Sequence, residues 1–342
     1  MERTLPLVSI VIPCRNEERF LGKCLETVLD QDYPRDRFEV MVVDGMSTDK
    51  TREIIKNYSD KYPLVRMLEN PKKFTPSAFN IGVRAAKGDY IIMMGAHAGY
   101  NRDYISKCVI HAQESGSDNV GGIVQIRAQH GKHAAAAIAK AISSAFGSGN
   151  AYYKTKKVAA PMAVDTVFGG CYKREVFGRV GLFDERLKRS QDMEFNMRLK
   201  KAGGRIMLYP DIVVGYFPKD SLKDFFIHNF WDGVWAVYPL KFMKMPLRPR
   251  HYAPLFFMIL LAGLAAAALF WHPASYLLAG LAAGYLALSL LISMATAIKE
   301  RDPYLALLLP PAFAARHFGY GFGSVWGIIK LSFPEKHGRQ KN

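Results

Sequence analysis

The sequence contains little cysteine, and the spacing of its cysteines excludes several kinds of site. Four are present, Cys14, Cys24, Cys108 and Cys171, and none forms a Cys-x-x-Cys pair. This scatter predicts neither a zinc-binding cluster nor a disulfide framework, so we expect reduced thiols. An N-terminal signal is not indicated either, because the early apolar run at residues 8–12 is too short and is typical of a buried strand. We therefore expect the N-terminal domain to stay in the cytosol.

Acidic residues are scarce relative to basic ones. Lysine and arginine number 46 against 30 acids, a formal net charge of +16. Such an excess favours anionic partners, namely phosphate groups, nucleic acid or acidic lipid headgroups. Zinc-finger and RNP-type motifs are absent, and much of the basic charge flanks apolar segments. Nucleic-acid binding is therefore not predicted.

Two long runs without charged residues begin after Tyr252. Residues 253–271 and 275–298 are each long enough to cross about 30 Å of hydrocarbon, although a buried helix pair in a soluble protein is the alternative. Basic residues flank the pair on both sides, and the short loop 272–274 between the runs has no lysine or arginine. This asymmetry predicts a multi-pass protein of the cytoplasmic membrane with both termini in the cytosol.

A third apolar stretch, residues 304–333, has a different character. It is interrupted by Pro310 and Pro311, carries Arg316 and His317, and precedes a basic tail. Because a straight third crossing would place that tail outside, we expect a re-entrant or interfacial segment. The expected organisation is a catalytic domain at 1–220, amphipathic interface helices at 221–250, a membrane region at 251–333 and a cytosolic tail at 334–342.

Short β-branched runs alternate with amphipathic patterns in the N-terminal part. Strands are expected at 8–13, 39–44, 65–68 and 90–94, and helices at 19–29, 50–58 and 76–86. Strand–helix–strand repetition predicts an α/β, Rossmann-like domain with a mostly parallel sheet. Ligands of such sheets collect at the carboxyl ends of the strands. Segments 13–17, 44–45 and 95–97 fall at that edge, so three strand ends predict one site.

Several motifs resemble those of one enzyme family. Residues 8–18 (VSIVIPCRNEE) and 42–49 (VVDGMSTD) closely resemble the opening of family-2 glycosyltransferases. The resemblance continues through segments 80–82, 86–90, 146–149, 168–174, 181–185 and 191–194. Within the family the chain is most similar to the succinoglycan-type glucosyltransferases of exopolysaccharide synthesis. This resemblance implies a GT-A fold, a nucleotide-sugar donor and a divalent metal, Mn²⁺ or Mg²⁺.

Residues after the first two strands are candidates for nucleotide binding. Asp44 can accept a hydrogen bond from the imide N–H of a uracil-like base, while Pro13, Arg15 and Glu17 wrap the ribose side. The alternative for Asp44 is a cap of the following turn or helix.

Two residues one helical turn apart are candidates for contacts with the diphosphate. These are Asn80 and Arg84, and a solvated helix face explains Arg84 equally well.

The fourth strand is followed by the candidate metal ligand. In the family this strand ends in Asp-x-Asp or Asp-x-His, whose last residue helps to bind the metal; here the segment is Gly95-Ala96-His97. His97 matches the ligand position, Gly95 replaces the first aspartate, and Gly95 and Ala96 are expected to line the nucleotide. Imidazole, diphosphate oxygens and water can hold Mn²⁺ or Mg²⁺, with weakened affinity. A purely structural histidine is the alternative.

Asp192 resembles the position where the family keeps its catalytic base. Displacement at an anomeric carbon needs a carboxylate to take the proton of the acceptor hydroxyl, and one carboxylate suffices for an inverting reaction. A first-turn acid of a helix is the alternative role, which Glu194 also fits. Gln191, Gly169 and Gly170 are candidates for sugar contacts, although paired glycines more commonly mark a turn.

Aromatic residues are concentrated at 225–238, with lysines at both ends. This pattern favours a helix at a membrane interface, and a core helix beneath the catalytic domain is the alternative. Trp231 is a candidate for acceptor contact. The similar families carry other residues at His228 and Trp231, so we expect acceptor recognition to differ.

The combined prediction is a metal-dependent inverting glycosyltransferase. It would move a sugar from a nucleotide diphosphate, such as a UDP-sugar, to a polyprenyl-(di)phosphate-linked saccharide or another lipid in cell-surface polysaccharide or glycolipid synthesis. The alternative is a catalytically degenerate protein of the same fold that binds a nucleotide sugar or lipid, because Gly95 removes one expected acid.

Overall fold

The chain folds into two compact units in the computed structural model, which describes residues 5–128, 132–149, 158–241 and 251–333. Unit 1 comprises Met1–Arg127 and Asn150–Phe217, and unit 2 comprises Ala128–Gly149 and Pro218–Asn342. The first unit thus ends near the boundary expected at residue 220, whereas residues 128–149 group with the C-terminal helices. Segment 242–250 and the expected tail 334–342 lie outside the described residues.

Unit 1 is built on one nine-stranded sheet with the order β3-β2-β1-β4-β8-β6-β9-β5, and β7 pairs with β9. Its strands are β1 (Val8–Cys14), β2 (Phe38–Asp44), β3 (Val65–Glu69), β4 (Tyr90–Met93), β5 (Ala98–Tyr100), β6 (Asn119–Ile126), β7 (Met162–Ala163), β8 (Cys171–Lys173) and β9 (Ile206–Tyr216). Strand β1 lies parallel to β2 and β4, and β2 lies parallel to β3. Strand β8 is antiparallel to both β4 and β6. The mostly parallel α/β sheet predicted from the sequence is confirmed.

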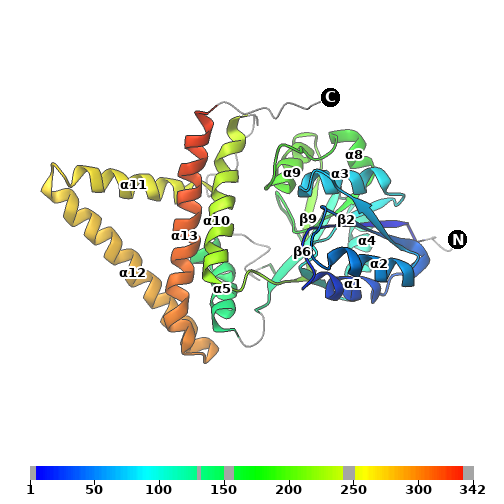
Figure 1. Ribbon diagram of the computed structural model, residues 1–342, viewed down its shortest axis with the longest axis horizontal. Coiled ribbons are helices and arrows are strands. Elements are labelled where there is room, and N and C mark those ends of the chain that lie inside the picture. The colour runs from blue at the N-terminus through cyan, green and yellow to red at the C-terminus, as the bar shows by residue number, and fades with distance from the viewer. Residues whose placement is uncertain (1–4, 129–131, 150–157, 242–250, 334–342) are drawn as a thin grey trace. The chain divides into compact units, whose positions relative to one another are not determined.

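Helices cover both faces of this sheet (Figure 1). On one face lie α1 (Leu21–Leu29), α2 (Thr51–Lys61) and α4 (Tyr104–Ser115); on the other lie α3 (Thr75–Ala85), α8 (Glu175–Val180) and α9 (Gln191–Lys201). Side chains of β1 alternate between two hydrophobic clusters, one on each face of the sheet. Ile10 and Ile12 belong to the cluster with Leu25, and Val11 belongs to the cluster with Phe195. Burial of these apolar side chains on both faces stabilises the sheet and fixes the positions of the strand ends.

Unit 2 is helical. It contains α5 (His133–Ser143), α6 (Ala145–Ser148), α10 (Leu222–Val237), η2 (Tyr238–Lys241), α11 (Ala253–Ala267), α12 (His272–Glu300) and α13 (Tyr304–Leu331). Helices α10 and α13 lie side by side (Figure 1). Glycines spaced four residues apart on α13, Gly319, Gly323 and Gly327, face successive turns of α10. Small residues at this spacing allow two helix backbones to approach closely.

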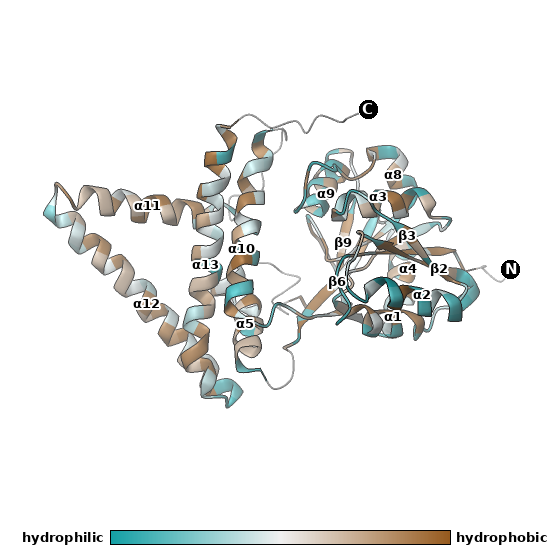
Figure 2. Cartoon of the chain, in the orientation of Figure 1, coloured by the Kyte–Doolittle hydropathy of each residue, from teal (hydrophilic) through white to brown (hydrophobic). Residues whose placement is uncertain are grey.

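Only one helix among the described residues is both long enough and apolar enough to cross a membrane. This helix is α12, and Figure 2 shows the apolar character of much of α11 and α12. The first span expected at 253–271 is not found as such, because α11 has 15 residues and is about 22 Å long, short of about 30 Å of hydrocarbon. The structure therefore does not support the predicted multi-pass topology.

Helix α13 continues through Pro310 and Pro311, where the sequence had led us to expect an interruption. Two prolines leave two backbone carbonyls without helical partners, which usually ends or kinks a helix. Here the adjacent side chains of Leu309, Ala312 and Phe313 are fully buried, so packing sustains the helix across the proline pair. Further along, the His317 imidazole contacts the Tyr285 hydroxyl of α12 at 3.0 Å.

Candidate functional site

Two loops join at the carboxyl edge of the sheet to form one surface. The last residues of β1 and β2, Cys14 and Asp44, are paired in register. Beyond them, the Asn16 backbone N–H donates to the Ser47 hydroxyl at 2.9 Å, and the Asn16 side chain accepts from the Thr48 N–H at 2.9 Å. Asn16 adopts a left-handed backbone with φ +54°. These reciprocal bonds hold the loop after β1 against the loop after β2.

Asp44 is buried beneath these loops. Its two carboxylate oxygens accept the Ser47 N–H at 3.2 Å each, and its Oδ2 lies 3.7 Å from Nη1 of Arg52. The side chain is fully buried, so a nucleobase reaches its carboxylate only if the 45–50 loop moves. The capping alternative considered for Asp44 is therefore present in this structure, while Pro13 and Arg15 lie on the adjoining strand end and loop.

Glu17 and His97 come together from different strand ends. Oε1 of Glu17 lies 3.4 Å from Nδ1 of His97, and both side chains are partly exposed. The imidazole also packs edge-on against Tyr216, with ring centroids 5.4 Å apart. Next to this pair, Gly95 donates its N–H to the Tyr100 hydroxyl at 2.7 Å. Ala96 is buried.

The donor set at this position suits a divalent cation only in combination with a ligand. Within the described parts of the chain, no cluster of three or more histidine, cysteine or acidic residues could hold a metal. Glu17 and His97 supply one carboxylate and one imidazole, a pair acceptable to Mn²⁺, and diphosphate oxygens would have to complete the coordination. The residues present therefore fit a metal that is held jointly with a nucleotide diphosphate.

Asn80 has a structural role. Its Nδ2 donates to the Phe183 carbonyl at 2.9 Å and to Glu185 at 3.0 Å, and its Oδ1 accepts the Phe183 N–H at 2.9 Å. Both amide donors are thus engaged, and we leave Asn80 out of the proposed site. Arg84 is exposed on the same helix. Burial raises the pKa of Glu185, but hydrogen bonds from Lys72 and Asn80 and the charge of Arg84 together bring it below its ordinary value.

The Gly169-Gly170 pair lies against the sheet. Both glycines have positive φ, +72° and +82°. A Cβ at Gly169 would lie 2.6 Å from the Met93 carbonyl, and one at Gly170 would lie 2.7 Å from Oδ1 of Asn119. Gly169 therefore allows a close backbone approach to the end of β4, and Gly170 leaves room for the Asn119 side chain, which explains this pair without a contact to a sugar.

The first turn of α9 carries Gln191, Asp192 and Glu194. Glu194 has a structural role, because its carboxylate accepts a hydrogen bond from Nε of Arg198 at 2.6 Å. Burial raises the pKa of Tyr172 above its ordinary value, and the negative charge of the nearby Asp192 raises it further. Oε1 of Gln191 is buried and receives no hydrogen bond from the part of the chain that the structure describes.

A chain of contacts connects α9 with the Glu17–His97 pair. Asn196, one turn after Asp192, donates to the Thr166 hydroxyl at 2.9 Å. Phe168, two residues after Thr166, packs edge-on against Tyr216, which in turn contacts His97. The loop at 166–170 thus links the helix of the candidate base to the candidate metal ligand.

Sequence reasoning missed two residues of this region, and a third candidate, Trp231, belongs to unit 2. Arg52 beside Asp44 and Tyr216 against His97 were not singled out; Arg52 lies directly after the Asp44 motif, whereas nothing in the sequence pairs Tyr216 with His97. Trp231 belongs to α10 of unit 2, where the Lys330 ammonium lies 5.4 Å from its ring centroid.

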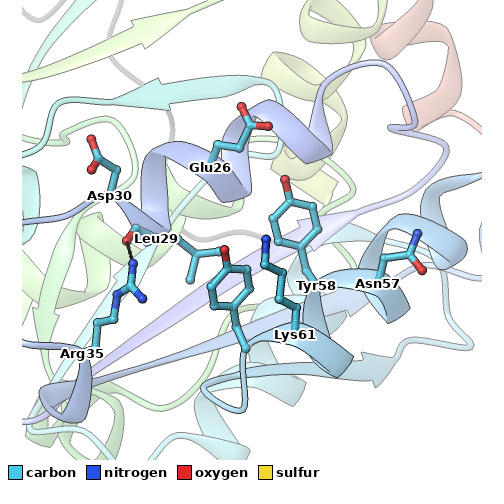
Figure 3. Close-up of a pocket in the computed structure, with 8 residues that line it drawn as sticks. Glu26, Leu29, Asp30, Arg35, Asn57, Tyr58 and Lys61 are labelled. Atoms are coloured by element: carbon cyan, nitrogen blue, oxygen red, sulfur yellow. Dashed lines mark hydrogen bonds between the residues drawn. The ribbon is translucent and has the colours of Figure 1, made fainter.

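A surface cavity of about 510 Å³ lies at the opposite edge of unit 1 (Figure 3). It is lined by the last turns of α1 and α2, including Glu26, Asp30, Tyr58 and Lys61, and by Arg35, which precedes β2. These segments are at the amino ends of the parallel strands. The carboxyl edge, where ligands of such sheets bind, is therefore the better candidate site.

Comparison with known proteins places the fold and the motifs in one family. The structure resembles that of mannosyltransferase PcManGT from Pyrobaculum calidifontis in complex with GDP-Man and Mn²⁺, with a TM-score of 0.61, 21% identity, and coverage of 95% of this chain and 88% of that chain. At this identity the likeness concerns the fold alone. The predicted GT-A fold is confirmed.

Two curated proteins match over most of their length. The chain is 30% identical over 333 residues, 94% of its own length and 97% of the relative, to the dolichyl N-acetyl-alpha-D-glucosaminyl phosphate 3-beta-D-2,3-diacetamido-2,3-dideoxy-beta-D-glucuronosyltransferase of Methanococcus voltae. It is 32% identical over 260 residues, 74% of its length and 77% of the relative, to the succinoglycan biosynthesis protein ExoA of Rhizobium meliloti (strain 1021). The family model "Glycosyl transferase family 2" matches residues 9–181. The predicted resemblance is thus confirmed, and the chain belongs to glycosyl transferase family 2.

Proposed function

We propose that this family-2 glycosyltransferase transfers a sugar from a nucleotide diphosphate, with inversion, to a lipid-linked saccharide. The observation that carries the proposal is the meeting of Glu17 and His97 at the carboxyl edge of the sheet, 3.4 Å apart, in a family-2 chain. Nucleotide sugars carry a diphosphate, and an imidazole and a carboxylate at this edge suit a cation that would neutralise it. Pro13, Arg15 and the loop held by Asp44 form the adjoining surface for the nucleoside.

Asp192 is the proposed general base. The acceptor hydroxyl gives its proton to the Asp192 carboxylate while its oxygen forms the new bond to the anomeric carbon. The bond from that carbon to the diphosphate oxygen breaks, and the nucleotide diphosphate leaves with the electron pair. A single displacement inverts the anomeric configuration. Asp192 is at the N-terminal turn of α9, where the helix dipole stabilises a carboxylate.

A bound divalent cation would neutralise the negative charge that develops on the leaving diphosphate. The protein contributes the Glu17–His97 pair, whose partly exposed position gives access to a ligand. The buried Oε1 of Gln191, beside the base, is an unused acceptor for a sugar hydroxyl.

The acceptor and the location are proposed from unit 2 and from one relative. The Methanococcus voltae relative is named for action on a dolichyl phosphate-linked sugar, which supports a lipid-linked acceptor here. Helix α12, whose most apolar 18-residue segment is 11% buried, supports attachment to a membrane. The aromatic helix α10, with Trp231 39% exposed, supports an interfacial position.

The alternative, a degenerate protein that binds a nucleotide sugar without turnover, is favoured by Gly95. This residue leaves the strand end without the aspartate of the family motif. Such a protein would bind nucleotide without enhancement by Mn²⁺ and would release no nucleotide diphosphate from a nucleotide sugar.

The two functions are separated by a screen of donors. The full chain in detergent micelles is incubated with UDP- and GDP-linked sugars, Mn²⁺ and a lipid extract, and the release of nucleotide diphosphate is measured. The proposal predicts release from at least one donor, dependent on the lipid extract and abolished by Asp192→Asn. No release from any donor, or equal release by the variant, would contradict it.

A further inference from the structure

We propose that Glu17 supplies the carboxylate ligand of the metal, in place of an acid at residue 95. The ion would be held between the loop after β1 and the loop after β4, by Glu17 and His97 together. This inference rests on the proposed nucleotide-diphosphate chemistry and assigns the side chains that make it metal-dependent. It differs from the family motif, in which both residues come from the loop after the fourth strand.

The two side chains lie close to the separation of two ligands on one ion. Metal–ligand bonds of about 2.1 Å at the octahedral angle preferred by Mg²⁺ place neighbouring ligand atoms about 3.0 Å apart. Oε1 of Glu17 and Nδ1 of His97 are 3.4 Å apart, so they would approach each other by about 0.4 Å. An ion can therefore enter with small side-chain movements.

The loop that carries Glu17 is fixed by backbone hydrogen bonds. The Glu17 N–H donates to the Thr51 hydroxyl at 2.7 Å, and the Glu17 carbonyl accepts from the N–H groups of Phe20 and Leu21 at 3.0 and 2.9 Å. Neither interaction uses the Glu17 side chain. The backbone of Glu17 is therefore held in place by the fold, and its carboxylate remains available to a ligand.

His97 is fixed in a similar way on the other side. Its ring packs against Tyr216, and β5, which begins at the next residue, pairs with β9 from Ala98 to Tyr100. Both ligands are thus positioned before a metal binds, which reduces the entropic cost of binding.

The missing aspartate at residue 95 is not explained by crowding. A Cβ built on Gly95 meets no atom of the described residues within 4 Å. A Cβ at this position is therefore not blocked by the surrounding loop. A carboxylate and an imidazole are the side-chain ligands that an Asp-x-His motif offers, so Glu17 with His97 keeps the same ligand types and formal charge.

Mn²⁺ binding tests the assignment directly. Full-length protein in detergent micelles is titrated with Mn²⁺ in the presence of UDP, and separately of GDP, and free Mn²⁺ is followed by electron paramagnetic resonance. We expect Glu17→Gln to weaken Mn²⁺ binding by at least about tenfold, while affinity for the nucleotide in EDTA stays unchanged. The added substitution Gly95→Asp should restore Mn²⁺ binding to Glu17→Gln. Glu18→Gln is the matched control, because Glu18 accepts the Lys50 N–H and is expected to leave Mn²⁺ binding unaltered.

Two results would overturn the inference: wild-type Mn²⁺ affinity in Glu17→Gln, or loss of nucleotide affinity in EDTA, which would make Glu17 a nucleotide contact. Failure of the proposed function gives a different pattern. Transfer by the wild type that is unchanged in EDTA keeps the transferase and rejects the metal assignment. Mn²⁺ binding that requires Glu17 without any transfer keeps the assignment and rejects the transferase.

Discussion

The two acids in the first turn of α9, Asp192 and Glu194, are assigned different roles. Glu194 is 9% exposed and is bound by Arg198, which also donates to the Leu182 carbonyl at 2.8 Å. This arginine ties α9 to the preceding loop, and Glu194 holds its guanidinium in position. Asp192 lies in the same turn, beside Gln191, whose Oε1 receives no hydrogen bond from the described residues. We propose Asp192 for proton transfer because it matches the position of the base in the family motif.

Asp192→Asn is expected to lower kcat by about 10² to 10⁴ while leaving donor affinity within a few-fold, because an amide cannot accept the proton. Initial rates of nucleotide diphosphate release and donor titrations measure the two quantities. Glu194→Gln should instead lower the thermal midpoint, because it weakens the pair with Arg198. Wild-type kcat in Asp192→Asn would reject Asp192 as the base.

The thiols provide a pH-dependent test of the core of unit 1. Burial raises the pKa of Cys24 from 9.0 to about 12, and burial with the charges of Asp44 and Glu17 also raises the pKa of Cys14. At pH 9 we expect Ellman's reagent to react slowly with the native protein and rapidly in urea, because burial keeps the Cys24 thiol protonated when the chain is folded. Rapid reaction of all four thiols in the native state would contradict the burial.

The raised pKa values of the buried thiols also determine whether the free energy of unfolding rises or falls with pH. Unfolded thiols ionise near their ordinary pKa, and the buried ones do not, so the folded state binds more protons between pH 9 and about 12. The free energy of unfolding is therefore expected to be unaffected by these thiols below pH 8 and to fall as the pH rises through 9. Urea unfolding at pH 7, 8, 9 and 10 measures it.

The positions of the candidate residues in the fold were easier to predict from the sequence than their contacts. Glu17, Asp44 and His97 were placed at strand ends, and the structure has them there. The roles of Asn80 and of Gly169 depend on partners far along the chain, Phe183 and Met93. A single sequence does not reveal which polar groups are already satisfied by such long-range contacts.

At the scale of elements, the glycine row of α13 determines how closely it approaches α10. A Cβ at Gly323 would lie 1.8 Å from the Phe230 carbonyl, a backbone atom that cannot rotate away. Gly323→Ala is therefore expected to force the helices apart and destabilise unit 2 by about 1–3 kcal/mol. Gly284→Ala on α12 is the matched control, because its Cβ meets no described atom within 4 Å.

Thermal unfolding in detergent micelles compares the two variants with the wild type. We expect a lower midpoint for Gly323→Ala and an equal or higher one for Gly284→Ala, since alanine favours the helix more than glycine does. Equal midpoints for both variants would show that α10 and α13 are not in close backbone contact.

The elements that were predictable have regular patterns. Strands β1 to β4 are short apolar runs, and their observed bounds differ from the predicted ones by one residue at most. Strands β6 and β9 were not proposed; β6 contains Gly121 and Gly122, and β9 contains Pro210 and Asp211, which are unusual inside strands. Their register shifts after Gly122, where a Cβ would lie 1.8 Å from the Ile212 carbonyl. Here the close packing of the two strands outweighs the local sequence pattern. Sequence reasoning therefore did not find these strands.

At the scale of the whole molecule, unit 1 carries the polar candidate site and unit 2 carries an apolar helix. Leu291, on α12, is 66% exposed, and its helix has the composition of a membrane span. Leu291→Arg is expected to make insertion less favourable by about 2.5–3.5 kcal/mol, whereas Leu291→Ala should have a small effect. Membrane fractions washed with alkaline carbonate measure the retained share. Release of the wild type by carbonate would contradict a spanning α12.

The composition change after Tyr252 indicated where the apolar part of the chain begins, but not how its helices end. Residues 253–271 contain no charged residue that would mark an end of the apolar run. Helix α11 nevertheless ends at Ala267 and is followed by turns before His272. The length of an apolar run sets the maximum length of a membrane-spanning helix. It does not determine where within the run the helix ends and a turn begins. The start of the apolar part of the chain was therefore more predictable than the number of crossings.

The anomeric configuration of the product tests the central claim most directly. The wild-type chain is incubated with the donor identified by the screen, Mn²⁺ and the lipid extract, and the glycolipid formed is analysed by NMR. A single displacement assisted by Asp192 predicts a glycosidic bond of inverted configuration, so an α-linked donor gives a β-linked product. A product of retained configuration, or donor binding with no product, would contradict the account.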